Sequence, residues 1–261
     1  MFTGDYWEGV TPPWWQILLT ILCVLAVIAG VIAIVSVVQK KRGVKFERST
    51  KDLTYGAICI AASFALSYVK FFSLPYGGSI TAASVLPMLI YCYYFGFRKS
   101  LVVSTVYMLL QFIQSPYIVS PWSALLDYVV PYMALSLVGL FKFNRKKYEK
   151  VTAEGKSPLR CHAGFFIGTS VYMVVRLFSH VLAGVLFWTS GVDFLGWTDP
   201  VGAAAWGYSV TYNTLFLVPD TAIALAAGIL LLSSKAFNAF MAASGNALKD
   251  PDAAHKDDER A

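Results

Sequence analysis

Five ionisable side chains lie inside apolar stretches of the sequence, where such groups are costly and usually serve a function. They are Lys70, Asp127, Arg176, His180 and Asp220. Two of them have a plain structural alternative. Lys70 stands about one turn from the end of its predicted helix, so its ammonium can reach the membrane surface. Asp220 follows Pro219, where a broken helix frees backbone groups that a carboxylate can bond.

Asp127 is the strongest candidate for ligand contact. It stands among apolar neighbours near the start of the predicted helix 124–141, with the polar ring of Tyr128 beside it. A capping role stays open, because Pro121 and Ser123 indicate a helix start nearby.

The predicted helix 163–188 carries Arg176, His180, Gly184 and Trp188 at intervals of four residues. This spacing places them along one slowly rotating face. Helix packing, with Gly184 allowing close approach, is the alternative. We favour a pocket wall, because packing does not call for these side chains together and the rings of His180 and Trp188 offer faces for stacking.

The predicted helix 201–233 carries Tyr208, Tyr212, Asn213 and Asp220. Asn213 and Asp220 share a face, and Tyr208 and Asn213 could flank one pocket. Tyr208 could instead anchor the helix at the membrane interface.

Together these helices offer a carboxylate, an imidazole, a carboxamide, phenols and an indole. Such groups suit a small, aromatic, nitrogen-rich cation. The set contains no nucleophile–base pair and no metal-ligand cluster, and the lone His180 is a poor zinc ligand. We therefore expect a binding protein without a metal or cofactor, and not an enzyme.

Composition identifies the element class that positions these groups. The 261 residues are 57% hydrophobic and 14% charged, against about 25% charged in soluble domains. This predicts an all-α membrane protein. Seven stretches are candidate spans: Trp15–Val38, Leu53–Phe72, Ile80–Gly96, Leu101–Gln114, Ala124–Phe141, Ala163–Trp188 and Val201–Ser233.

Basic residues predict the orientation. Apart from Lys70 and Arg176, every lysine and arginine falls in 39–52, 97–100, 142–162 or the tail from 234. The positive-inside rule places these segments in the cytoplasm and the N-terminus outside the cell membrane. It also accounts for the net charge of +6 without nucleic acid.

Several ordered motifs resemble one known family, the thiamine-specific substrate-binding (S) components of energy-coupling factor (ECF) transporters. The motifs span about 53–234 and comprise Pro75–Ile80, Leu86-Pro87 with Phe95-Gly96, Leu126–Val130, Arg176–Gly184 with Phe187-Trp188, and Tyr208–Asn213 with Val218-Pro219.

The resemblance implies a six-helix bundle that binds thiamine from outside, here over 53–234. It places an additional helix and basic linker before it (1–52) and a charged tail after it (235–261). The family's ligand-binding positions fall on Asp127, Tyr128, His180, Gly184, Trp188, Tyr208 and Asn213. Asp127 would balance the thiazolium charge, with Trp188 stacking on the aminopyrimidine.

The family's mechanism implies protein partners. A transmembrane coupling subunit with two ATPase subunits energises transport, and small residues on the first family helix make the docking face. Here these are Ala57 and Ala61, with Ala65 continuing the line. Internal packing or lipid contact is the alternative for this face.

The chain departs from the family in two places. Some members have a tryptophan where this chain has Gly78, so a stacking wall is missing or replaced by Tyr76. The loop Tyr76, Gly77, Gly78 and Ser79 is expected to be a mobile lid. The span Trp15–Val38 is an addition to the six-helix core. Two other functions stay open: an S-component for a thiamine precursor, and a self-sufficient secondary transporter of an organic cation.

Overall fold

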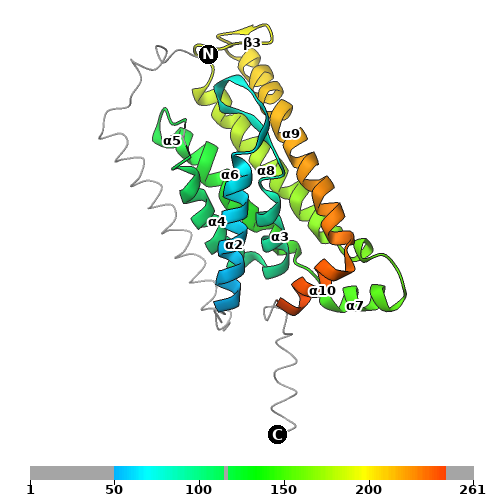
Figure 1. Cartoon of the computed structure of the whole chain (residues 1–261). Coiled ribbons are helices and arrows are strands. Elements are labelled where there is room, and N and C mark those ends of the chain that lie inside the picture. Colours follow the sequence, from blue (N-terminus) through cyan, green and yellow to red (C-terminus); the bar gives the residue numbers. More distant parts are fainter. Residues whose placement is uncertain (1–49, 115–116, 245–261) are drawn as a thin grey trace, which may run out of the picture.

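The computed structural model describes residues 50–114 and 117–244, which form a bundle of helices with short hairpins at one end (Figure 1). In chain order the elements are α2 (Thr50–Ser67), β1 (Lys70–Ser73), η2 (Pro75–Gly77), β2 (Ser79–Thr81), α3 (Leu86–Phe95), α4 (Phe97–Gln111), α5 (Pro121–Ala124), η3 (Leu125–Val129), α6 (Val130–Ala134), η4 (Leu135–Phe141), α7 (Arg145–Ala153), η5 (Pro158–Cys161), α8 (Ala163–Phe187), β3 (Asp193–Phe194), β4 (Trp197–Thr198), α9 (Ala203–Ser233) and α10 (Lys235–Ser244).

Helices dominate the described residues, as the composition predicts. Three helical segments there are long and apolar enough to cross a membrane: 121–141, α8 and α9. Every predicted span from residue 53 onward contains a helix. The predicted span Trp15–Val38 lies outside the described residues, as do the basic residues between 40 and 48 and the tail beyond 244.

The predicted helix 53–72 is too long at its C-terminal end. The helix α2 stops at Ser67, and Lys70–Ser73 forms strand β1, which pairs antiparallel with β2. The Ser67 hydroxyl donates to Phe64 O (2.6 Å), which satisfies a carbonyl at the helix end. Lys70 is exposed in this strand, so the helical position predicted for it is wrong.

The predicted helix 80–96 also begins later than expected. Residues 79–81 form β2, Ala83 has a positive φ of 57°, and α3 starts only at Leu86. Pro87 stands at the first turn of this helix, where its missing N–H costs nothing and its fixed φ is helical. Pro87 therefore indicates where α3 begins, which the apolar run alone does not show.

The segment 121–141 is a composite helix. Ser120 caps its start through a reciprocal bond with Ser123, so Asp127 is not the cap. The central turn η3 is π-helical, with Val130 N donating to Leu125 O, and η4 is a 3₁₀-helix. The π turn contains Asp127, and such turns are frequent at functional sites.

The two ends of the bundle differ (Figure 1). We call the end with β1, β2, β3 and β4 the hairpin end. The opposite end, with α7, α10 and the start of α4, we call the basic end. The linker 142–162 contains the short helix α7, and residues 235–244 of the predicted tail form α10.

An aromatic core fills the basic half of the bundle. Tyr91 stacks on Phe95 with ring centroids 4.4 Å apart, and Phe165 contacts Tyr93 at 5.6 Å. Asn238 of α10 closes this core by accepting from Tyr94 Oη at 2.7 Å. The helices are thus fixed together away from the hairpin end.

Candidate ligand-binding site

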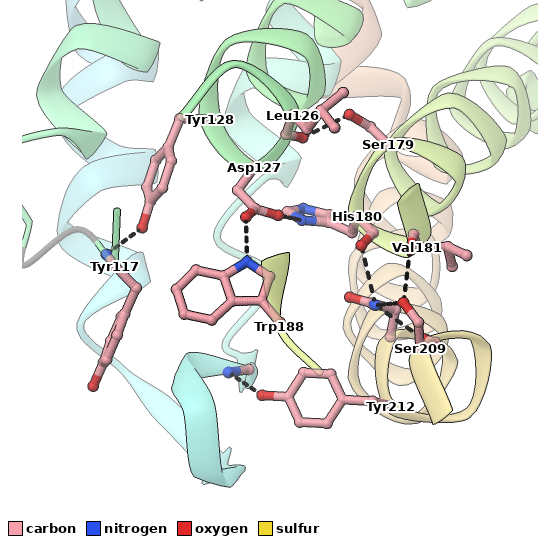
Figure 2. A network of polar contacts seen from close by, with 12 residues as sticks. Tyr117, Leu126, Asp127, Tyr128, Ser179, His180, Val181, Trp188, Ser209 and Tyr212 are labelled. Carbon is pink, nitrogen blue, oxygen red and sulfur yellow. Dashed lines mark hydrogen bonds and ion pairs between the residues drawn. The ribbon is translucent and has the colours of Figure 1, made fainter. Parts of the chain in front are cut away.

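Three predicted site residues meet through one carboxylate near the hairpin end (Figure 2). Asp127 Oδ1 accepts from His180 Nδ1 at 2.9 Å, and Asp127 Oδ2 accepts from Trp188 Nε1 at 2.9 Å. A carboxylate only accepts, so the proton of a neutral His180 stands on Nδ1 and Nε2 is an acceptor. His180 and Trp188 therefore bond to Asp127 through ring nitrogens at their edges, and their ring faces are left for other contacts.

The π turn explains how the main chain tolerates this arrangement. Val130 N–H bonds to Leu125 O, and residue 131 is a proline, which carries no N–H. The Leu126 carbonyl is thereby left for a side chain, and Ser179 Oγ of α8 donates to it at 2.6 Å. This bond attaches the Asp127 turn to α8 one residue before His180 (Figure 2).

Gly184 lies at a close approach of α8 to α9. A Cβ placed there would meet Ser209 Oγ at 2.1 Å, so glycine is required for the close approach. Asn213 uses its Nδ2 on Ser209 O (2.9 Å) and on His180 O (3.4 Å). Its Oδ1 accepts no hydrogen bond from the described residues and is available to a ligand.

Tyr208 and Tyr212 stand side by side on α9, with ring centroids 5.9 Å apart. Tyr208 is buried within the bundle. Tyr212 Oη accepts from Gly78 N at 2.9 Å and donates to Pro75 O, so it fixes the predicted lid loop to α9.

Gly78 and Tyr76 explain the family departure in the loop. A Cβ on Gly78 would lie 2.8 Å from Tyr212 Oη and 2.9 Å from Phe216, so a tryptophan does not fit there. Tyr76 has a positive φ of 62°, and its Oη accepts from Asp193 N at 3.1 Å. Tyr76 thus links the loop to the β3–β4 hairpin, while Ser79 belongs to strand β2.

Tyr128 is held beside Asp127 by another loop. Its Oη accepts from Tyr117 N at 2.8 Å, and its ring lies 5.1 Å from Phe112. Figure 2 shows the Tyr128 ring on the opposite side of Asp127 from His180. The Tyr128 ring of η3 therefore lies on one side of Asp127, and the His180 ring of α8 lies on the other (Figure 2).

The four-residue stripe on α8 contacts two different carboxylates. Four residues turn a helix by about 400°, so each step drifts by about 40°. His180 bonds to Asp127, whereas Arg176 faces Asp220, 3.6 Å away between Nη1 and Oδ2. Trp188 lies just beyond the helix, which ends at Phe187.

The predicted docking residues lie on the surface of α2. Ala57, Ala61 and Ala65 are all exposed, whereas Gly56 and Ser63 are buried. The described residues therefore leave the alanine face uncovered.

Sequence reasoning missed several residues that build the site. Ser179 and Ser209 bond to main-chain carbonyls, and Phe216 lies 6.3 Å from the His180 ring. Pro131 stands four residues after Asp127 and has no N–H to donate to a carbonyl of the preceding turn. The sequence could therefore have indicated that a carbonyl near Asp127 needs a side-chain donor. The partners of these serines depend on helix packing and carry no local signal.

Comparisons with known proteins identify the family of this chain. A family model described as thiamine transporter protein matches residues 53–239. The thiamine transporter ThiT of Bacillus subtilis strain 168 is 29% identical over 167 residues, which cover 63% of this chain and 81% of the relative.

A solved structure of ThiT from Listeria monocytogenes has a similar fold, with a TM-score of 0.58 and 22% identity. The superposition covers 71% of this chain and 94% of that one. The family match confirms the resemblance drawn from the motifs, and this is a membrane protein of several spans. The chain belongs to the thiamine transporter protein family.

Proposed function

We propose that this protein binds thiamine with high affinity outside the cell membrane and is the substrate-specific subunit of an ECF-type transporter. A separate coupling subunit with two ATPase subunits supplies the energy. The observation that carries the ligand assignment is the Asp127 carboxylate, which His180 and Trp188 fix among aromatic rings.

Each part of thiamine has a suitable counterpart in the site. Asp127 retains lone pairs beyond its two internal bonds and supplies negative charge to the thiazolium. The ring faces of Tyr128, His180 and Trp188 offer stacking and cation–π attraction. The free Oδ1 of Asn213 suits the exocyclic amine of the pyrimidine. Tyr208 and the loop 76–79 complete the enclosure.

Charge distribution supports the proposed orientation. Arg98, Lys99 and the basic residues of α7 lie at the basic end, and the site lies toward the opposite, hairpin end (Figure 1). Under the positive-inside rule the basic end faces the cytoplasm. The C-terminus is then cytoplasmic, the N-terminus is outside, and the site opens outward. In this scheme 53–234 is the binding domain, 1–52 adds a span and linker, and 235–261 is the tail.

A thiamine titration of the purified chain tests the ligand assignment. Quenching of tryptophan fluorescence should saturate at or below micromolar thiamine, because Trp188 lies in the site. The pyrimidine and thiazole fragments should bind more weakly, since each meets only part of the enclosure. Equal binding of the pyrimidine fragment and thiamine would instead assign a thiamine precursor as the ligand.

An uptake experiment tests the energy source. Cells should accumulate labelled thiamine only when this chain and an intact ATPase module are present together. Vesicles that contain this chain alone should show no uptake under a proton gradient. Gradient-driven uptake in those vesicles would establish a self-sufficient secondary transporter and overturn the proposed coupling.

Ala57→Leu and Ala61→Leu test docking on α2. Both should leave thiamine binding unchanged and reduce uptake, because a bulky side chain prevents close helix approach. Ala222→Leu on α9 is a matched control, since Ala222 is also exposed on a long apolar helix. If all three variants transport normally, the alanine face is not the docking surface.

A further inference from the structure

A buried ion pair lies between α8 and α9, apart from the Asp127 cluster. Arg176 Nη1 is 3.6 Å from Asp220 Oδ2, and the two side chains are 12% and 3% exposed. Arg176 Nη1 also donates to Tyr172 Oη at 3.1 Å. The ligand assignment leaves this pair unused.

The second oxygen of Asp220 holds the foot of the predicted lid loop. Asp220 Oδ1 accepts from Thr81 N at 2.9 Å and from Thr81 Oγ1 at 2.6 Å. Thr81 ends strand β2, and its Oγ1 lies 2.7 Å from Ser84 Oγ before α3 begins. A residue deep in α9 thus fixes the point at which the loop joins the bundle.

The loop has a second attachment on the same helix, at Tyr212, which holds Gly78 and Pro75. Tyr212 and Asp220 are eight residues apart, so both attachments belong to one segment of α9. Positive φ angles occur at Tyr76, at Gly77 and just past the foot at Ala83. The backbone that could bend therefore lies around the two attachment points.

The Asp220 attachment is the costlier of the two to break. A buried carboxylate that loses its donors keeps its desolvation penalty, and bonds to charged groups are stronger than those between neutral groups. Arg176 lies beside the carboxylate and orients it. We therefore expect opening of the loop at its foot to cost more free energy than opening at Tyr212.

We propose that Asp220, oriented by Arg176, is a positioning residue that fixes the foot of the loop on α9 and thereby slows ligand release. The inference rests on the proposed thiamine-binding function. It concerns the rate at which the ligand leaves, and Asp220 need not touch the ligand.

Thr81→Val is the test, because valine keeps the branched shape and puts a methyl group in place of the hydroxyl that bonds to Asp220 and Ser84. Replacing Asp220 itself risks misfolding, since Arg176 would be left buried without its counter-charge. Stopped-flow fluorescence should show thiamine dissociating at least about tenfold faster from Thr81→Val, with little change in association. Thr81→Ser should restore the slow rate, because it restores the hydroxyl.

Thr221→Val is the matched control. Thr221 neighbours Asp220, is as buried as Thr81 (6% exposed each), and bonds to Met173 Sδ instead of the loop. It should leave dissociation unchanged. Equal acceleration by both variants, or no rescue by Thr81→Ser, would show general loosening of the bundle and overturn the proposal.

Hydrogen exchange on the ligand-free protein separates this inference from the proposed function. Amides of 78–82 should exchange at least about tenfold faster in Thr81→Val than in Thr221→Val. This readout does not require thiamine, so it decides the role of Asp220 even if the wild type binds another ligand. Unchanged exchange in Thr81→Val would refute it.

Discussion

The two histidines of the helical region illustrate how the two ends of this molecule differ. At the hairpin end, His180 bonds to the Asp127 carboxylate, in a cluster that Trp188 completes. At the basic end, His162 is fully buried against Tyr93, with its Nδ1 3.1 Å from Tyr93 Oη. Burial lowers the pKa of His162 to about 4, so it stays neutral at physiological pH.

The contrast extends to the groups around each histidine. The basic half is packed by aromatic rings such as Tyr91, Phe95 and Phe165. The hairpin end is joined by hydrogen bonds between helices and loops, including the bonds of Tyr212 to the loop. Ring packing holds one arrangement, whereas polar contacts can be exchanged for contacts with a ligand. We therefore expect mutations to separate stability from binding along the bundle.

Phe165→Ala should have the largest effect, on stability alone. Phe165 is fully buried, and truncation of a buried Phe costs about 3–5 kcal/mol. The lower end applies here, because lipid tails add no hydrophobic term to helix packing. Thermal unfolding in detergent measures the loss. Phe178→Ala on the same helix is the control, since Phe178 is exposed and should cost little. A large loss of thiamine affinity in Phe165→Ala would contradict the expectation that mutations at the two ends affect stability and binding separately.

Asp127→Asn should have the next largest effect, on binding. Loss of a charge-assisted contact should weaken thiamine affinity by about 1.5–3 kcal/mol. The loss of stability should be smaller than in Phe165→Ala, because asparagine keeps one side-chain acceptor for His180 or Trp188. The fluorescence titration measures it. Asp193→Asn at the same end is the control, because Asp193 is exposed in the β3–β4 hairpin. Unaltered affinity in Asp127→Asn would make Asp127 a structural residue.

Gly184→Ala should lower both the stability of the bundle and the affinity for thiamine. The new Cβ would overlap Ser209 Oγ, and overpacking typically costs about 1–3 kcal/mol. Unfolding and titration should be measured together. Ser209→Ala in the same chain should recover part of the loss, because it removes the Oγ that clashes. Absence of any recovery would mean that the loss does not come from the contact with Ser209 Oγ.

Tyr212→Phe should have the smallest effect. It leaves Gly78 N without its acceptor and should weaken binding by about 0.5–1.5 kcal/mol, since the loop has a second attachment at Asp220. Titration beside Tyr208→Phe measures it. A loss as large as that of Asp127→Asn would point to direct contact between Tyr212 and the ligand.

Much of this structure was predictable from the sequence. Apolar length predicted the helices, and the polar residues inside them predicted which helices carry the site. The boundaries at Ser67 and Leu86 were not predictable from hydropathy, because Phe71, Phe72 and Ile80 of the short hairpin continue the apolar runs of the neighbouring helices. The sequence placed Arg176 on the same slowly rotating face as His180, but it did not indicate that Asp220 of α9 is the partner of Arg176.

The pairings themselves required the structure. Nothing near Thr81 in the sequence indicates Asp220, which lies 139 residues away. The same holds for Ser179 and the Leu126 carbonyl. Such contacts depend on how the helices pack against one another. Sequence patterns show which face of a helix is polar, but they do not show which residue that face contacts.

The π turn at Leu125–Val129 amounts to a one-residue insertion in an otherwise regular helix. Each residue turns a helix by about 100°, so deleting one residue there would restore the α-helical register and swing Asp127 away from His180. Relatives that lack this extra residue would place their acidic group on another face. Alignments of this helix should therefore be anchored separately before and after the turn.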